Sequence, residues 1–394
     1  MRRADHRGAQ VIGTVNATSL LTKLAAKSKR VLLISNTVMH YRVSVYNYFH
    51  RRFAEHDWEW MVLTSRLQPQ NRLAPHFQLE EIPFDFGAYR RRIRELRPDV
   101  VILFLHLKDR ILWPLIHWLK WTGIPFASWT KTRNLDDPHN RIKNTCFDYV
   151  HRMSDGLILY SGDLDRFLSK RDKKKAFVAN NTINHEDFPA VTESREEIKR
   201  SLNIPFKKVV LFVGRMEIDG GRKRVDHLIE IFRDMTGQEV GLVIVGSGLS
   251  PAWQARINPL TTRYLGEVHD PENRQIARIF SMADVCAIPG HVGLGLNQAF
   301  FYALPVVTMA GSQPPEIAYL RPGRNGYIVP ANNVQQLRAR IFELLADDAL
   351  RARFAGAAKD VFHQEASVEG MFQGFHQCVE FMARRGRGDD VLEA

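Results

Sequence analysis

Short apolar runs alternate with longer, more polar stretches along the first half of the chain. Five of these runs cover residues 30–35, 58–63, 100–105, 125–129 and 156–160. They are apolar nearly throughout rather than at every second position, which is typical of strands that are buried on both faces of a sheet. The intervening segments are long enough for helices. The pattern therefore predicts a doubly wound, parallel α/β domain over residues 30–190.

The second half of the chain repeats this pattern after a charged connector at residues 189–206. Apolar runs at 207–213 and 284–288 are expected to be strands, and residues 296–303 are expected to be a helix. We expect a second Rossmann-like domain over residues 205–360. Ligands of such sheets bind at the carboxyl ends of the strands, so a cleft between two facing domains is the expected site. Residues 1–29 are expected to be a poorly ordered N-terminal extension.

A glycine-rich turn at residues 289–295 connects an expected strand to an expected helix. Gly290, Gly293 and Gly295 lie within it. A turn of this kind can direct backbone N–H groups and a helix N-terminus towards an anion such as phosphate. Glycine-rich turns are also ordinary connections in Rossmann-like sheets, so the turn alone leaves both interpretations open.

Two basic residues follow the expected strand at 207–213. Arg215 comes directly after Gly214, and Lys223 stands at the start of a helical segment. An arginine offers a planar fork of donors for phosphate oxygens, while a lysine offers a mobile point charge. A cation at a helix N-terminus opposes the helix dipole, and a nearby anion would explain its presence. The alternative is that Lys223 and Arg224 are solvated charges.

Five short motifs in the second half together resemble those of a known family. They are Gly214-Arg215 with Lys223 and Leu228-Ile229, Val-Gly-Ser-Gly at 245–248, and the segments 264–268, 280–285 and 315–326. Their order and spacing resemble the retaining, nucleotide-sugar-dependent glycosyltransferases of group 1 (family 4-like), which have the two-domain GT-B fold. The resemblance implies that Gly214, Arg215, Lys223, Gly293 and Leu294 bind the donor diphosphate. It also implies that residues 361–385 form a helix that crosses back to the first domain, and that no metal or other cofactor is required.

The chain departs from this family at its Glu-x7-Glu pair, where Gly290 and Gln298 stand in place of the two carboxylates. Gln298 can still accept a hydrogen bond from a ribose hydroxyl, with a loss of about 1 kcal/mol of charge assistance. His291 and Glu316 are the other candidates for contacts with the donor ribose or sugar, although a loop histidine is also common as exposed polar surface. The missing carboxylates leave a second hypothesis open, a catalytically inactive GT-B protein that acts as a binding or scaffold protein.

Several residues of the first domain are expected to face the cleft. The resemblance places acceptor or cleft contacts at His40, Tyr41 and Arg42, after the first apolar run. Lys131, after the run at 125–129, is a further candidate for a phosphate or acceptor contact, the alternative being a solvated surface charge. His106 ends the run at 100–105 and is the candidate catalytic residue near the transferred sugar, the alternative being a hydrogen-bonded cap of the sheet. In the family, retaining transfer is thought to need no enzymic base, because the leaving phosphate can take the acceptor proton. Positioning and charge stabilisation would then be the main work of the enzyme.

The composition and charge of the chain limit the kinds of ligand and binding partner that it is expected to have. The chain has 394 residues, of which 45% are hydrophobic, enough for two cores. Its three cysteines are far apart and follow no metal-binding spacing, which favours a reducing compartment. Residues 201–394 carry equal numbers of basic and acidic side chains, so the whole net charge of +12 arises in residues 1–200. No nucleic-acid recognition motif accompanies this charge, and we expect no nucleic-acid partner.

Basic and aromatic residues occur together at 89–97 and 111–121. This combination favours an anionic membrane surface or a lipid-linked diphosphate; the alternative is that Trp113, Trp118 and Trp121 pack a helix on the sheet. No apolar run reaches the ~18 residues of a membrane span. We expect a cytoplasmic protein, with peripheral association on the inner face of the membrane as the further option. The expected activity is retaining transfer from a nucleotide sugar to a glycan or lipid-linked acceptor, in polysaccharide, lipopolysaccharide or glycolipid biosynthesis.

Overall fold

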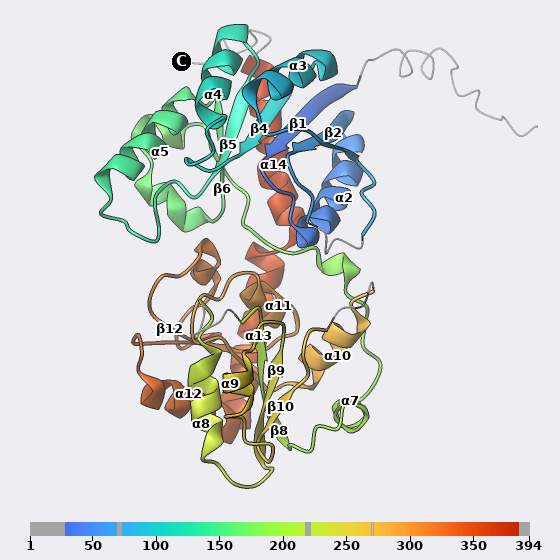
Figure 1. The fold of residues 1–394 in the computed structure, drawn as a ribbon, viewed down its shortest axis with the longest axis vertical. Coiled ribbons are helices and arrows are strands. Elements are labelled where there is room, and N and C mark those ends of the chain that lie inside the picture. Colours follow the sequence, from blue (N-terminus) through green and yellow to red (C-terminus); the bar gives the residue numbers. More distant parts are fainter. Residues whose placement is uncertain (1–27, 69–72, 217–221, 269, 271, 386–394) are drawn as a thin grey trace, which may run out of the picture.

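The computed structural model describes residues 28–68, 73–216, 222–268, 270 and 272–385. Two α/β domains follow one another along the long axis of the molecule, each with its own parallel sheet (Figure 1). The predicted fold class, two Rossmann-like domains, is confirmed. Most of the predicted N-terminal extension lies outside the described residues. Among the described helices, none has the length and apolar character needed to cross a bilayer.

The first domain contains a seven-stranded parallel sheet in the order β3-β2-β1-β4-β5-β6-β7. Its strands are β1 (Lys29–Ser35), β2 (Trp58–Thr64), β3 (Gln78–Glu81), β4 (Val100–Phe104), β5 (Phe126–Thr130), β6 (Gly156–Leu159) and β7 (Ala176–Val178). The five predicted runs form the five central strands. The two edge strands were not predicted, because β3 is polar and β7 has only three residues.

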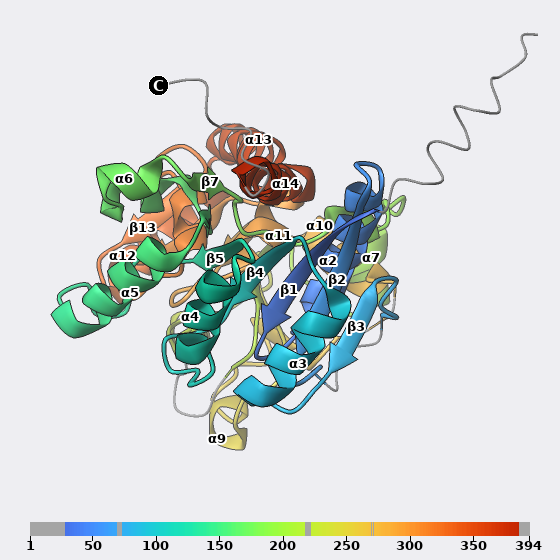
Figure 2. The ribbon, with the colours of Figure 1, turned by 90° about the horizontal axis from the view of Figure 1, so that it is seen from above.

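Helices cover both faces of this sheet (Figure 2). On one face α2 (His40–Ala54) packs with α14 (Val368–Arg385), and on the other α3 (Phe86–Leu96) lies beside α4 (Leu112–Thr122). Each face has its own apolar cluster. The first domain also contains α5 (Arg141–Met153), η1 (Gly162–Phe167) and α6 (Lys170–Lys173). After it come η2 (His185–Asp187) and α7 (Arg195–Ser201), and Ile198 of α7 belongs to the apolar core of the second domain.

The three tryptophans near α4 have different environments. Trp118 is buried against α3, where its ring lies 6.5 Å from that of Phe86, and Trp113 is half-buried. Trp121, at the end of the helix, is 80% exposed. Packing on the sheet therefore accounts for Trp118 but leaves Trp121 unexplained.

The second domain has a six-stranded parallel sheet in the order β10-β9-β8-β11-β12-β13. Its strands are β8 (Lys208–Val213), β9 (Val240–Val245), β10 (Thr262–Tyr264), β11 (Val285–Ala287), β12 (Val306–Met309) and β13 (Gly326–Val329). Its helices are α8 (Val225–Arg233), α9 (Pro251–Gln254), α10 (Arg274–Met282), α11 (Gly295–Phe301), η3 (Pro315–Tyr319), α12 (Val334–Ala346) and α13 (Asp348–Glu365).

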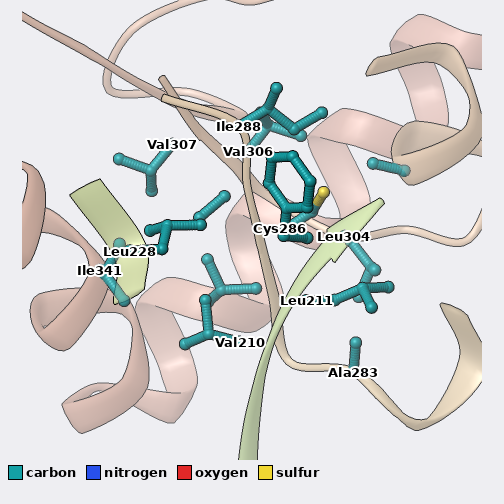
Figure 3. Close-up of a cluster of buried hydrophobic side chains, with 14 of the residues drawn as sticks. Val210, Leu211, Leu228, Ala283, Cys286, Ile288, Leu304, Val306, Val307 and Ile341 are labelled. Atoms are coloured by element: carbon teal, nitrogen blue, oxygen red, sulfur yellow. The ribbon is translucent and has the colours of Figure 1, made fainter. Parts of the chain in front are cut away.

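One large apolar cluster forms the core of this domain. Figure 3 shows part of it, where Cys286 of β11 lies among aliphatic side chains from the neighbouring strands, including Leu211 and Val306. Burial raises the pKa of the Cys286 thiol to about 12, so this cysteine is a packing residue rather than a nucleophile.

The chain passes between the domains twice, at residues 179–182 and at 366–367. Thr182 donates a hydrogen bond to the carbonyl of Ala366, so the two crossings are tied together. α13 packs on the second domain, whereas α14 packs on the first, with Phe372 against Phe49 and Phe53. The helix that returns to the first domain is thus Val368–Arg385, and residues 361–365 of the expected segment belong to α13.

Candidate functional site

The residues expected to form the site lie in the loops and helices that follow strands of the two sheets, and direct contacts join some of these loops across the domain interface. Ser312, after β12, donates to Asp136 Oδ1 at 2.7 Å, and Arg222 Nη2 lies 3.8 Å from the same oxygen. Asp136 belongs to the loop after β5 in the first domain. The carboxyl ends of the strands therefore meet at the domain interface, where ligands of parallel sheets bind.

Lys223 is held firmly in the second domain. Its ammonium donates to the carbonyl oxygens of His291 and Val292, each at 3.0 Å. Its stem packs over Gly214, where a Cβ would come within 2.4 Å of the lysine Cδ. Burial lowers the pKa of Lys223 to about 8. Two of the three ammonium donors are used, which leaves one for an anion.

Gly290 occupies a position at which no larger residue fits. Its N–H donates to the carbonyl of Lys223 at 3.0 Å, and the N–H of His291 donates to the carbonyl of Arg222 at 2.7 Å. A Cβ at residue 290 would lie 2.0 Å from the oxygen of Arg222. The backbone of the glycine-rich turn is thus paired directly with the backbone that carries Lys223. This contact gives a physical reason for the absence of a glutamate at residue 290.

The turn itself is fixed by a residue that the sequence did not indicate. Gln313 donates from its amide nitrogen to the carbonyl of Gly290 at 3.0 Å and accepts from the N–H of Val292 at 3.1 Å. Gly293 then has a φ of 56°, in the left-handed region that glycine adopts readily. Leu294 precedes α11, and Gln298 is half-buried on that helix, with no side-chain hydrogen bond among the described residues. Its amide remains available to a ligand.

His291 lies among three cations that come from both domains. Burial, together with the charges of Arg222, Lys223 and Lys131, lowers its pKa to about 4, so the imidazole is neutral at pH 7. Asp136 is the nearby carboxylate; its hydrogen bond from Ser312 is the main cause of its lowered pKa. Cations outnumber anions in this part of the interface, and the arrangement is suited to a dianionic group.

Arg215 differs from Lys223 in its surroundings. Its side chain is exposed and has no hydrogen-bond or ion-pair partner among the described residues. It is followed at once by Met216 and then by residues 217–221, which lie outside the described part of the chain. The guanidinium of Arg215 is therefore available to a ligand, but the structure does not show it next to the ammonium of Lys223.

Arg42 and Glu316, expected at opposite sides of the site, are joined through the interdomain linker. The buried guanidinium of Arg42 donates from Nη2 to Asn181 Oδ1 at 2.5 Å, and the amide nitrogen of Asn181 donates to Glu316 Oε1. Asn297 and Tyr319 both donate to the carbonyl of Asn181, each at 3.1 Å. Glu316 thus faces the linker. Asn181 was not predicted, because a single asparagine in a connector carries no sequence signal.

The guanidinium of Arg42 is only partly satisfied. It lies 4.7 Å from the centre of the Trp129 ring, and its Nη1 is buried without a hydrogen-bond partner among the described residues. An unpaired buried donor costs about 1–3 kcal/mol unless a ligand or water meets it. Arg42 is therefore both an interdomain contact and a candidate for substrate contact.

The remaining candidates of the first domain lie in separate loops. His40 begins α2, and its Nδ1 lies 3.0 Å from the amide oxygen of Gln68, while Tyr41 packs edge-on against its ring. His106 follows β4, and its backbone N–H donates to Asp109 Oδ2 at 2.7 Å. Its imidazole has no hydrogen-bond partner among the described residues, and burial lowers its pKa. Lys131 is exposed near His291.

Comparison with known proteins supports one class of protein. Residues 207–347, from the start of β8 to the end of α12, match the family model described as "Glycosyl transferases group 1". The matched segment covers most of the second domain. The chain is 30% identical over 161 residues to a phosphatidyl-myo-inositol mannosyltransferase of Mycobacterium leprae (39% of this chain and 41% of that protein), and 25% identical over 174 residues to spore coat protein SA of Bacillus subtilis (41% and 45%). The chain matches less than half the length of these relatives.

Solved structures extend the likeness over both domains. The Anabaena protein Alr3699/HepE in complex with UDP matches with a TM-score of 0.71 and 15% identity, over 89% of this chain and 99% of that chain. At this identity the likeness shows the fold alone, and the fold is GT-B. Within the described residues, no group of three or more His, Cys, Asp or Glu side chains is arranged to hold a metal ion.

Proposed function

We propose that the protein transfers a glycosyl group from a nucleoside diphosphate sugar to a glycan or lipid-linked acceptor, with retention at the anomeric carbon. The observation that carries the proposal is the fixed ammonium of Lys223, with one unused donor, beside Arg222 and Lys131 at the domain interface. The family match of the second domain and the relatives that act as glycosyltransferases support it. A cell-surface polysaccharide, lipopolysaccharide or glycolipid pathway is the proposed setting, on the cytoplasmic side of the membrane.

The cations would act on the leaving group. In the transfer, the bond between the anomeric carbon and the phosphate oxygen breaks while a bond to the acceptor hydroxyl oxygen forms on the same face. The acceptor proton passes to the leaving phosphate oxygen. Charge grows on the diphosphate during this step, and the ammonium of Lys223 is already in place to stabilise it. Arg215 and the backbone of Gly214, Gly293 and Leu294 complete the proposed diphosphate site.

Neutral side chains would position the sugars. His291 and Gln298 are proposed to contact the donor sugar and ribose, and Glu316 acts by holding Asn181 and Arg42. Burial lowers the pKa of His106 and so favours the neutral imidazole, which is suited to exchange a hydrogen bond with the transferred sugar. His40 and Tyr41 are proposed for the acceptor side.

Stereochemistry provides a direct test of this proposal. Incubation with UDP-glucose, GDP-mannose or ADP-glucose and a panel of glycan acceptors should give a product whose anomeric coupling in NMR spectra matches that of the donor. Lys223→Ala should abolish the product, whereas Lys207→Ala, at an exposed ion pair remote from the site, should not. An inverted product would contradict the retaining mechanism, and full activity of Lys223→Ala would contradict the diphosphate site.

One observation favours a second candidate function. Gly290 cannot be replaced by a larger residue without displacing the Arg222 backbone, so the first carboxylate of the Glu-x7-Glu pair in the family that the sequence resembles has no counterpart there. A protein that binds a nucleotide sugar without transferring it fits this feature. Saturable donor binding without turnover in the same donor and acceptor panel would favour this alternative.

A further inference from the structure

A ridge of unpaired arginines runs along α3, on the far side of the first domain from the domain interface. Arg90, Arg91 and Arg94 are exposed on the helix, and Arg97 follows as its C-cap. Spacings of three and four residues place them on one side of the helix. We call these four residues the α3 arginine ridge. They line a surface hollow of about 740 Å³ together with Arg30, Gly87 and Glu95.

The charges of the ridge are not balanced by carboxylates. Arg30 is paired with Glu59, and Glu95 is paired with Arg92, which lies outside the ridge. None of the four ridge arginines has an acidic partner among the described residues. Like charges three or four residues apart destabilise a helix. Arg94 lies four residues from Arg90 and three from Arg91, so these cations repel, and an external anion would relieve the repulsion.

Two of the ridge arginines lie over aromatic rings. The guanidinium of Arg94 lies 5.7 Å from the centre of the Trp118 ring on α4, and that of Arg90 lies 5.8 Å from the Phe86 ring. Trp121 stands one turn further along α4 than Trp118 and is 80% exposed. Figure 2 shows α3 and α4 side by side on the same face of the sheet. The surface thus combines unpaired cations with an exposed indole.

We propose that the α3 arginine ridge and Trp121 form a docking surface for an anionic phospholipid bilayer. Guanidinium groups pair with headgroup phosphates, and an exposed tryptophan favours the membrane–water interface. Figure 1 places both helices at the end of the first domain that is remote from the second, so docking there leaves the candidate donor site free. This proposal is independent of the glycosyl transfer proposed above.

Vesicle flotation with the full chain tests the proposal. The probes are vesicles of phosphatidylcholine alone and of phosphatidylcholine with phosphatidylglycerol in equal proportions. The double variant Arg90→Gln/Arg94→Gln should bind the anionic vesicles roughly 25-fold more weakly, at about fivefold per arginine. Trp121→Ala should weaken binding as well. Residues 1–27 are unchanged in these variants, so their basic side chains cannot account for the difference.

A matched control is available in the second domain. Arg338 and Arg353 also lie over aromatic rings, those of Phe342 and Phe354, and Arg338→Gln/Arg353→Gln removes the same net charge. This control should bind the anionic vesicles as the natural chain does. Equal losses in the two double variants, no binding by the natural chain, or equal binding to neutral vesicles would each overturn the proposal. The proposal would also be overturned if the natural chain bound duplex DNA but no vesicles, and the ridge variant lost the DNA binding. Calorimetry with UDP should give the same affinity for the ridge variant and the natural chain, which separates this surface from the donor site.

Discussion

Replacement of Gly290 by glutamate tests how the glycine-rich turn is held against the Lys223 backbone. The substitution restores the residue type that the resembling family has, so the family pattern alone predicts a neutral or beneficial effect. The structure predicts the opposite, because a Cβ at residue 290 would lie 2.0 Å from the carbonyl oxygen of Arg222. Real Cβ contacts begin near 3 Å, so the two backbone segments must move apart by about 1 Å.

The magnitude follows from the contacts that this movement breaks. The hydrogen bonds from Gly290 to Lys223 and from His291 to Arg222, at 3.0 and 2.7 Å, would both be lost. Each is worth about 1 kcal/mol, and overpacking adds about 1–3 kcal/mol, giving a loss of about 3–5 kcal/mol in the free energy of unfolding of the second domain. At about 2–4 °C per kcal/mol for a domain of this size, the Tm should fall by roughly 10 °C.

Thermal unfolding followed by calorimetry, with and without UDP, is the assay. Gln298→Glu is the matched control, because it restores the other carboxylate of the family pair at a half-buried position with no side-chain hydrogen bond to lose. Its Tm should change little. If Gly290→Glu unfolds at the same temperature as the natural chain and binds UDP normally, the steric account of this glycine is wrong.

Three further predictions concern charge and hydrogen bonding. Because the pKa of Lys223 is about 8, its ammonium loses its charge above pH 8, and UDP affinity measured by calorimetry should fall there; a flat affinity from pH 7 to 9.5 would argue against contact with Lys223. This pKa lies below that of an unfolded lysine, so between the two pKa values the unfolded state binds one more proton than the folded state. The contribution of Lys223 to the free energy of unfolding therefore rises with pH in that window. Asn181→Ala leaves Arg42 Nη2 and Glu316 without their partner and should lower the free energy of unfolding by about 2–4 kcal/mol in denaturant titrations, with strong coupling to Glu316→Gln in a double-mutant cycle; additive effects would contradict the network. His106→Ala should lower kcat at least tenfold with unchanged UDP affinity and Tm, since its imidazole makes no hydrogen bond to any of the described residues, whereas a large loss of Tm with normal kcat would show a purely structural role.

The sequence predicted the parts of the fold that depend on continuous apolar runs. The five central strands of the first sheet are such runs, and their parallel order follows from the helices between them. The edge strands β3 and β7 were missed because an edge strand needs neither length nor apolar character. Where α13 ends and α14 begins depends on which domain each helix packs against, and this cannot be read from a continuous helical pattern.

The sequence predicted the candidate site only where a residue belongs to a recognisable sequence motif. Lys223 and Gly214 were indicated by the family motif that this sequence resembles, and the structure packs the stem of Lys223 against Gly214. The roles of Gln313 and Asn181 arise from contacts between segments far apart in sequence, and neither residue stands out in its local pattern. The absence of a glutamate at residue 290 could be seen in the sequence, but its steric cause lies in the backbone of Arg222 and only the structure shows it.

The central claim is that the domain interface binds a nucleoside diphosphate through Lys223 and Arg215. Isothermal titration of the natural chain, Lys223→Ala and Arg215→Ala with UDP, GDP and ADP tests it most directly. The account predicts saturable binding of one nucleotide, weakened at least tenfold in each variant, whose Tm without nucleotide stays close to that of the natural chain. Absence of binding by all three nucleotides, or equal affinity of the natural chain and both variants, would contradict it.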